Sequence, residues 1–360
     1  MPNQTLNKTR IYLPESMSGV VLTAHGETDK LHYRNDLEIP TLTSHDVLIR
    51  VAAAGINNTD INTRLAWYSK GEADSADASW SGQALTFPLI QGADVCGTIV
   101  AVGSAVDPKR IGERALIEPC LQEHNSEPLN PPGYFGSECH GGFAEYTKVA
   151  NRHAYAIQSN LSDTELASFP CSYSTAENML SRANVNRQDI VLISGASGGV
   201  GSAAVQLAKA RGAHVIAITS ASKRLALLDI GADQVVTREE DLVTALGENS
   251  VDVVVDLVAG KTWPVFLQLL KPGGRYAVAG AIGGAFVELD VRSLYLKDLS
   301  LFGCTVLAPE VFQNLIHYLE EGKIQPLVAQ TYPLKEIVKA QEAFQKKHHL
   351  GKIVLNIMKD

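Results

Sequence analysis

Residues 191–224 constrain the fold more than any other stretch, because they read as a strand, a glycine turn, a helix and a second strand in that order. The apolar run 191–193 is typical of a buried parallel strand, and the helix is expected over 199–211. Glycines in the turn let a phosphate approach the backbone, and the helix points its free N–H groups and positive dipole end at that phosphate. We therefore predict a dinucleotide-binding unit whose pyrophosphate is cradled by Ser197, Gly198, Gly199 and Val200.

The residues after the second strand indicate which dinucleotide is bound. An acidic residue usually stands there and binds the ribose 2′-OH of NAD. Here Thr219 takes that place, followed by Ser220, Lys223 and Arg224. Hydroxyls and two cations suit a 2′-phosphate, so the sequence predicts NADPH as the cofactor. Two alternatives stay open: the glycine turn could close a strand–helix junction without a ligand, and the two cations could be an ordinary solvated helix start.

Composition excludes several classes of protein. The chain has 360 residues, enough for two domains with a core each, and its net charge of −8 argues against nucleic acid or an anionic membrane surface as partners. No apolar run approaches the ~20 residues of a membrane span, and the first residues lack the apolar core of a secretory signal. The five cysteines are an odd and scattered set that makes no disulfide framework. We therefore expect a cytoplasmic protein.

The pattern of the chain changes near residue 160. Before that point, strand-like segments separated by Gly, Pro and Asn predict a β-rich domain, at 18–24, 46–55, 97–103 and 143–150. Two polar or proline-rich stretches, 69–87 and 120–140, are expected to be long loops, which tend to be lids or binding loops.

After residue 160, strands and helices alternate, which predicts an α/β doubly wound parallel sheet. The expected strands are 189–195, 214–219, 234–236, 252–256, 274–280 and 300–304, and the expected helices are 199–211, 222–230, 239–246, 261–270 and 309–321. We place the β-rich domain at 1–158 and the dinucleotide-binding domain at 159–323, with 324–360 returning to the first domain.

Motifs along nearly the whole chain resemble those of the medium-chain dehydrogenase/reductase superfamily. They are GINNTDINTRLAWY (55–68), GADVCGTIVAVG (92–103), GGFAEYTKV (141–149), STAENML (174–180), GASGGVG (195–201), LKPGGRYAVAG (270–280) and LGKIVL (350–355). Within the superfamily, the chain looks most like the zinc-free quinone oxidoreductase and enoyl reductase branch. The resemblance implies a GroES-like catalytic domain, a Rossmann domain, a cleft between them, and hydride transfer from NADPH to an unsaturated carbonyl compound. We expect a small-molecule substrate and a homodimer or homotetramer.

The ligands of a catalytic zinc are incomplete in this sequence. Asn57 takes the place of the family's first ligand, Ala93 takes the place of its histidine, and only Cys171 remains. Catalytic zinc generally needs three protein ligands, so we expect no metal and expect Cys171 to fill a small apolar space. In the region of the family's structural zinc, the spacing is also unsuited to a metal site; the residues there are Cys120, His124, Cys139 and His140.

Tyr68 and Asn57 are the candidate catalytic residues. In related enoyl reductases, a tyrosine at the place of Tyr68 assists proton delivery, and a phenol can bind the carbonyl oxygen or donate a proton as an enolate forms. Asn57 could donate an N–H to the substrate carbonyl or to the nicotinamide ribose. The alternatives are a packed aromatic ring for Tyr68 and a turn-stabilising side chain for Asn57. Asp60 and Arg64 lie four residues apart and are expected to pair if the stretch is helical.

Further residues are expected near the nicotinamide. Thr175 would face its amide, and the loops after the later strands would approach the ring through Val258, Gly280, Ala281 and Ile282. Lys352 lies in the closing motif of the superfamily and could reach the cleft, but a solvated strand residue is the favoured interpretation. Besides a reductase of quinones, enones or enoyl thioesters, two functions stay open: a zinc-free alcohol or aldehyde oxidoreductase, and a non-catalytic NADPH-binding protein.

Overall fold

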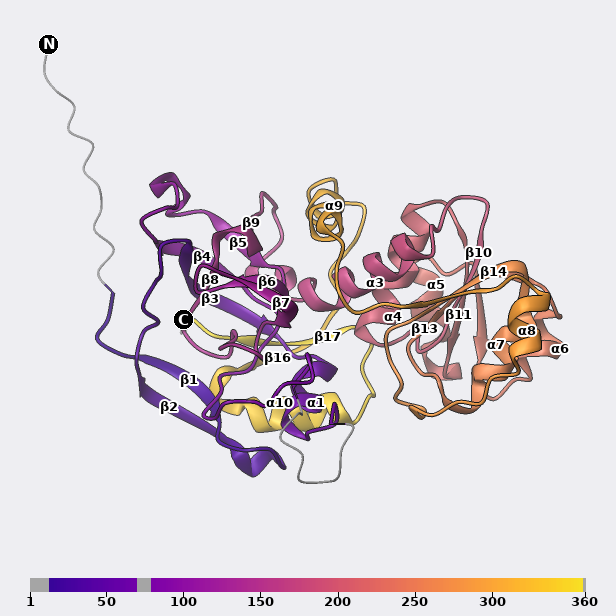
Figure 1. Ribbon diagram of the computed structural model, residues 1–360, viewed down its shortest axis with the longest axis horizontal. Coiled ribbons are helices and arrows are strands. Elements are labelled where there is room, and N and C mark those ends of the chain that lie inside the picture. Colours follow the sequence, from indigo (N-terminus) through magenta and orange to yellow (C-terminus); the bar gives the residue numbers. More distant parts are fainter. Residues whose placement is uncertain (1–12, 70–78, 359–360) are drawn as a thin grey trace, which may run out of the picture.

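The computed structural model describes residues 13–69 and 79–358 and shows two bodies side by side, each built around its own sheet (Figure 1). No helix within these two ranges is long and apolar enough to cross a membrane. The expected loop 69–87 lies partly outside them. Its described end, residues 79–87, has neither helix nor strand, as predicted.

One body is a six-stranded parallel sheet in the order β12-β11-β10-β13-β14-β15, which confirms the predicted doubly wound α/β sheet. Its strands are β10 (Ile190–Ile193), β11 (His214–Thr219), β12 (Gln234–Thr237), β13 (Val251–Asp256), β14 (Leu270–Val278) and β15 (Ser300–Gly303). Its helices are α3 (Pro170–Arg182), α4 (Gly199–Ala210), α5 (Arg224–Asp229), α6 (Leu242–Leu246), α7 (Trp263–Leu269), α8 (Val291–Leu296) and α9 (Pro309–Glu320).

The central strand β10 shows why this sheet is buried on both faces. Val191 and Ile193 pack into the core formed with α3, α4 and α9, whereas Leu192 packs into the core formed with α6 and α7 on the other face. Side chains alternate between the faces of a strand, so an unbroken apolar run is what a strand covered on both sides requires. Strand order reverses between β10 and β13, and ligands of such sheets bind at the carboxyl ends of the strands near that reversal.

The second body is a seven-stranded sheet in the order β16-β17-β3-β4-β5-β9, with β8 also paired to β3. The strands are β3 (Asp46–Gly55), β4 (Cys96–Val102), β5 (Arg114–Ile117), β8 (Tyr146–Ala150), β9 (Ala154–Ala156), β16 (Val328–Pro333) and β17 (Lys352–Asn356). The helices are α1 (Asn58–Arg64), α2 (Asp163–Leu166), which packs on β3 and β4, and α10 (Ile337–Gln345). A separate pair, β1 (Met17–Leu22) and β2 (Leu31–Leu37), lies beside this sheet. Because β17 pairs with β3, the end of the chain lies in the sheet of its first third. The domain limits given above stay a proposal.

The prediction of a loop over 120–140 was wrong. The structure has a hairpin there, made of β6 (Cys120–His124) and β7 (Glu127–Tyr134). Asn125 and Ser126 both have positive φ, which is the backbone of a two-residue hairpin turn. The prolines of β7 are tolerated because a two-stranded ribbon leaves the outer edge of each strand without a partner.

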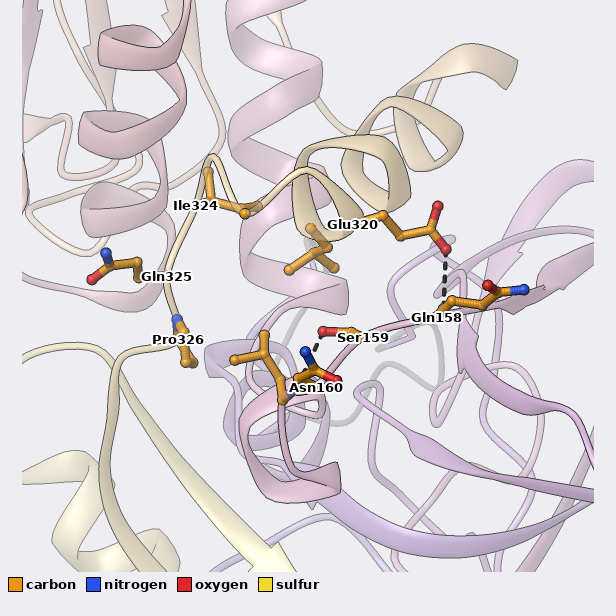
Figure 2. A pocket seen from close by; sticks show the side chains of 10 residues that line it. Gln158, Ser159, Asn160, Glu320, Ile324, Gln325 and Pro326 are labelled. Atoms are coloured by element: carbon orange, nitrogen blue, oxygen red, sulfur yellow. Dashed lines mark hydrogen bonds between the residues drawn. The ribbon is translucent and has the colours of Figure 1, made fainter.

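Two linkers join the bodies and line a cavity of about 530 Å³ (Figure 2). One linker contributes 158–161 and the other 324–326. The Gln158 N–H donates to Glu320 Oε1 at 3.0 Å and holds the first linker to the end of α9. None of the residues predicted to bind cofactor or substrate lines this cavity, so we assign neither to it.

Candidate active site

The glycine turn between β10 and α4 fits a phosphate-binding loop. A Cβ on Gly201 would lie 2.3 Å from the carbonyl oxygen of Gly195, so only glycine lets the helix pack this closely on the turn. A Cβ on Gly199 would lie 2.6 Å from Ser172 Oγ and 3.0 Å from Lys352 Cδ. The start of α4 therefore packs against Ser172 on α3 and against the side chain of Lys352. This contact places the Lys352 side chain next to the glycine turn.

Thr219 ends β11 as predicted, and its surroundings suit a ligand that the protein alone does not supply. Its buried hydroxyl Oγ1 has no hydrogen-bond partner among the described residues, which is rare for a buried polar group. Ser220 and Ser222 pair with each other at 3.2 Å, and Arg224 is exposed. A ribose hydroxyl or phosphate beside Thr219 would satisfy the unpaired oxygen.

Lys223 is held against the phosphate-binding loop by the C-terminal segment. Its Nζ donates to the carbonyl oxygens of Lys347 and His349 at 2.9 and 2.8 Å and lies 3.5 Å from Ser197 Oγ. Within the described residues, no carboxylate forms an ion pair with Lys223. The ammonium is therefore available to an anion on the loop, unlike that of a solvated helix start.

Lys347 is a second cation at this seam, and the sequence reasoning missed it. Its Nζ donates to Asn58 Oδ1 at 2.9 Å and lies 3.6 Å from the centre of the Phe344 ring. Burial, together with the nearby charges of Lys352 and Lys223, lowers the pKa of Lys347 to about 8. Lys223 and Lys347 form no ion pair with a carboxylate of the described residues, so their charges favour a bound phosphate; the basic run 346–349 was the available signal.

Beneath the loop, a buried hydrogen-bond network is centred on Asp94. One carboxylate oxygen accepts from the Cys171 backbone N–H at 2.6 Å, and the other accepts from Asn57 Nδ2 and Lys352 Nζ, each at 2.8 Å. Lys352 also donates to Asn57 Oδ1. Lys352 is only 2% exposed, so the expectation of a solvated strand residue was wrong. Its motif placed it on a strand but could not show that a carboxylate 258 positions earlier faces it.

The expected Asp60–Arg64 pair was also wrong, although the stretch is helical. Asp60 accepts from the backbone N–H groups of Asn57 and Gly92, and burial raises its pKa to about 7. Arg64 is fully buried and donates instead to the Gly26 carbonyl and to Gln341. Asp60 thus caps the start of its own helix, and Arg64, which also lies 3.6 Å from the Glu27 carboxylate, binds groups of other elements, so the two side chains do not pair along the helix.

Two phenols approach this region. Tyr68 is half-buried and its hydroxyl donates to Thr59 Oγ1 at 3.2 Å; burial raises its pKa, so the phenol is protonated at neutral pH. Tyr134 is buried, and its hydroxyl donates to Cys171 Sγ at 3.0 Å. Burial raises the pKa of the Cys171 thiol to about 12. Sequence reasoning singled out Tyr68 but missed Tyr134.

The loops after β13 and β14 lie together, as their predicted common role requires. The Gly283 N–H donates to the Val258 carbonyl at 2.7 Å, and a Cβ on Gly280 would lie 2.6 Å from the Leu257 carbonyl oxygen. Ile282 is 68% exposed. On α3, the Thr175 hydroxyl donates to the Cys171 carbonyl at 2.7 Å, which leaves its oxygen free to accept. The two loops therefore lie together at the carboxyl ends of β13 and β14.

Comparisons with known proteins give the family. The model of the alcohol dehydrogenase GroES-like domain matches residues 43–159, and that of the zinc-binding dehydrogenases matches residues 199–321. A solved structure from Sinorhizobium meliloti, described as a provisional alcohol dehydrogenase, is 44% identical, covers 96% of this chain and 97% of its own, and has a TM-score of 0.89. The chain belongs to the medium-chain dehydrogenase/reductase superfamily.

Among the relatives of this chain are members of the quinone oxidoreductase-like branch of the superfamily. The rat quinone oxidoreductase is 28% identical, with 94% of this chain and 97% of the relative covered. An acryloyl-coenzyme A reductase from Metallosphaera sedula is also 28% identical, with 94% and 99% covered. These findings confirm the predicted family and the GroES-like and Rossmann folds. This protein is an oxidoreductase of a superfamily that uses a nicotinamide cofactor and small-molecule substrates.

Proposed function

We propose that this protein transfers hydride from NADPH to a quinone or to an α,β-unsaturated carbonyl compound, without catalytic zinc. The observation that carries the proposal is the Lys352 ammonium, which is bound to Asp94 and Asn57 directly beneath the glycine turn. It supplies a fixed positive charge where relatives that use zinc need ligands.

Zinc, which the name of the second family model implies, does not fit the side chains here. Asn57 Oδ1 is taken by Lys352, both carboxylate oxygens of Asp94 are taken, and Ala93 has no donor atom. A divalent cation would also face the Lys352 ammonium at short range, which is unfavourable in a buried site. Within residues 13–69 and 79–358, no three His, Cys, Asp or Glu side chains are arranged to hold a metal ion.

The surrounding residues suit the binding and orientation of a nicotinamide cofactor. When bound, NADPH would supply the hydride. The positive charges of Lys223 and Lys347 favour its phosphates, and the unpaired Thr219 hydroxyl favours its adenosine ribose. We place the nicotinamide amide at Thr175 and its ring against Val258 and the loop of Gly280, Ala281 and Ile282. Asn57 is a positioning residue, because both ends of its amide are already bonded.

We further propose that Tyr68 delivers a proton to the reduced substrate. Hydride adds to the unsaturated carbon, the π electrons move to the carbonyl oxygen, and the resulting enolate takes a proton at its α-carbon. The Tyr68 phenol, protonated at neutral pH, is the donor that we assign to this step. Water would return the proton to the phenolate afterwards.

The proposal is tested by a substrate screen. Purified protein at catalytic concentration is mixed with NADPH and with quinones, enones, enoyl thioesters, aldehydes and alcohols, and NADPH oxidation or formation is followed. Turnover of quinones or enones supports the proposal. Turnover of aldehydes or alcohols alone would favour the alternative that the Sinorhizobium relative suggests, and tight NADPH binding without any turnover would indicate a non-catalytic binding protein.

Cofactor preference gives the first prediction. A phosphate bound by lysine or arginine gains charge-assisted hydrogen bonds worth roughly 1.5–3 kcal/mol each, so NADPH should bind at least tenfold tighter than NADH. Lys223→Ala should reduce the ratio between the dissociation constants of NADH and NADPH. Lys339→Ala, which removes an exposed lysine on α10, should leave this ratio unchanged. Titration of protein fluorescence with each cofactor measures both constants. Equal dissociation constants for NADPH and NADH in the native protein would contradict the assignment.

Metal content gives the second prediction. Chelator-washed protein should contain well under one zinc per chain and keep its full turnover, because the donor set around Asn57 and Cys171 lacks three ligands. Elemental analysis and an assay before and after washing test this directly. A stoichiometric zinc whose removal abolishes turnover, and whose return restores it, would refute the zinc-free proposal.

We also propose that the protein forms a homodimer or homotetramer through the free edge of the six-stranded sheet. Among the residues that the structure describes, the edge strand β15 pairs with β14 alone. Apolar side chains are also exposed in the segment between β14 and β15, where Phe286 is 98% exposed and Leu296 is 71% exposed. Unpaired strand edges and apolar patches of this kind are usually covered in soluble proteins. The cytoplasmic location stays a prediction.

A further inference from the structure

We propose that Tyr134 donates a hydrogen bond to the carbonyl oxygen of the substrate. The inference rests on the hydride transfer proposed above and adds a residue whose role is separate from that of Tyr68. It also gives a function to the β6–β7 hairpin, which ends at Tyr134.

Tyr134 lies in an apolar cluster that joins the two bodies. The body with the seven-stranded sheet contributes Ala93, Cys120 and Tyr134. The nucleotide-binding body, which has the six-stranded sheet, contributes Cys171, Leu307 and Val311. Binding sites for small carbonyl compounds are usually apolar with a few polar groups, and they occur between domains. In this cluster, the side-chain groups able to donate a hydrogen bond are the phenol of Tyr134 and the thiols of Cys171 and Cys120.

The Tyr134 hydroxyl is paired with a poor acceptor. A phenol is a good donor, whereas the sulfur of a thiol is a weak acceptor, so the bond to Cys171 Sγ leaves most of the donor strength unused. The Tyr68 hydroxyl, by contrast, donates to an alcohol oxygen. A carbonyl oxygen placed beside Cys171 would therefore displace the sulfur from Tyr134 at little cost in free energy.

Both sides of the Tyr134–Cys171 contact are held in place. The Tyr134 N–H donates to Glu138 Oε2 at 2.7 Å, and the phenol ring packs on Trp80 with 4.9 Å between ring centres. Glu138 also accepts from the Ser81 N–H at 2.8 Å, which fixes Trp80 beside the ring. Cys171 is anchored through its own N–H to Asp94. A donor fixed before the substrate arrives needs little reorganisation, which is what makes such donors effective.

The position suits the charge that develops during reduction. Hydride from the nicotinamide adds to the substrate carbon, the nicotinamide is oxidised, and the electron pair of the broken π bond moves to the carbonyl oxygen. Tyr134 keeps its proton and donates a hydrogen bond to that oxygen, whereas Tyr68 transfers its proton to the α-carbon. Burial raises the pKa of Tyr134 well above its ordinary value, so the phenol remains a donor throughout.

The test compares Tyr134→Phe with Tyr173→Phe. Tyr173 is a matched control, because its buried hydroxyl donates to the Gln325 carbonyl in the core of the other body. Tyr134→Phe should lower kcat about 10²-fold for quinones and enones alike, the range seen when one oxyanion donor is removed. The Kd of NADPH should stay unchanged, and Tyr173→Phe should keep the native kcat per folded protein. Thermal melts confirm that both variants fold.

A spectroscopic measurement keeps the inference testable if Tyr134→Phe folds poorly. The infrared carbonyl stretch of a ¹³C-labelled enone, bound to native protein with oxidised cofactor, should be shifted down by the hydrogen bond. An unshifted stretch, or a Tyr134→Phe variant whose kcat stays within twofold of that of Tyr173→Phe, would overturn the role of Tyr134. In either case, native turnover would leave the proposed function standing. Failure of the native protein to reduce any quinone or enone would overturn both.

Discussion

Lys352→Met is expected to destabilise the protein by about 3–5 kcal/mol, because it leaves a buried carboxylate without its counter-ion. Asp94 and Lys352 are both at most 2% exposed, and 2.8 Å separates their charged atoms. The remaining donors to Asp94 are the Cys171 N–H and the Asn57 amide. Two neutral donors cannot replace the charge of an ammonium at a buried carboxylate. Thermal and urea denaturation of the apo-protein measure the loss.

Two further variants separate the buried charge from the loss of a lysine as such. Lys339→Met removes one partner of an exposed pair with Glu336 at 3.1 Å and should cost less than about 1 kcal/mol. Adding Asp94→Asn to Lys352→Met should restore part of the stability, because the uncompensated charge is then gone. If Lys352→Met and Lys339→Met melted at the same temperature, the Asp94–Lys352 pair would have no structural role.

Local signals predicted the nucleotide-binding body well. The order of the six-stranded sheet follows from strands and helices that alternate in sequence, and the close approach at Gly201 follows from the glycine pattern. Each of these features is decided by residues near one another in the chain. The prolines of 120–140 misled the prediction, because proline breaks central strands but is tolerated in a two-stranded ribbon.

The site could be predicted only in part, since its contacts join distant segments. The sequence pointed to Asn57 and Cys171, but it did not indicate that both bind Asp94. The structure shows this, together with the contact between Asp94 and Lys352 at the start of β17. Tyr134 carries no motif, and its meeting with Cys171 depends on how two bodies pack. Such pairings depend on tertiary structure rather than on spacing, so no local pattern records them.

Tyr68→Phe is expected to lower turnover of enones about 10²-fold, the low end for loss of a general acid. The effect should be smaller with quinones, because a reduced quinone takes its protons at oxygen directly from water. The NADPH affinity should barely change, since the predicted cofactor contacts lie mainly on the other body. Steady-state kinetics with one enone and one quinone, together with NADPH titration, measure all three quantities.

The substrate dependence distinguishes Tyr68 from Tyr134. Loss of a carbonyl donor affects every carbonyl acceptor, whereas loss of a proton donor affects only substrates that are protonated at carbon. Tyr68→Phe should therefore change the enone-to-quinone ratio of kcat, and Tyr134→Phe should leave that ratio nearly constant. Tyr332→Phe is the control, because its half-buried hydroxyl donates to Gln330 on β16. Full enone turnover by Tyr68→Phe would show that the proton comes from water or from another group. The hydrogen bond from Tyr68 to Thr59 would then hold the phenol away from the substrate.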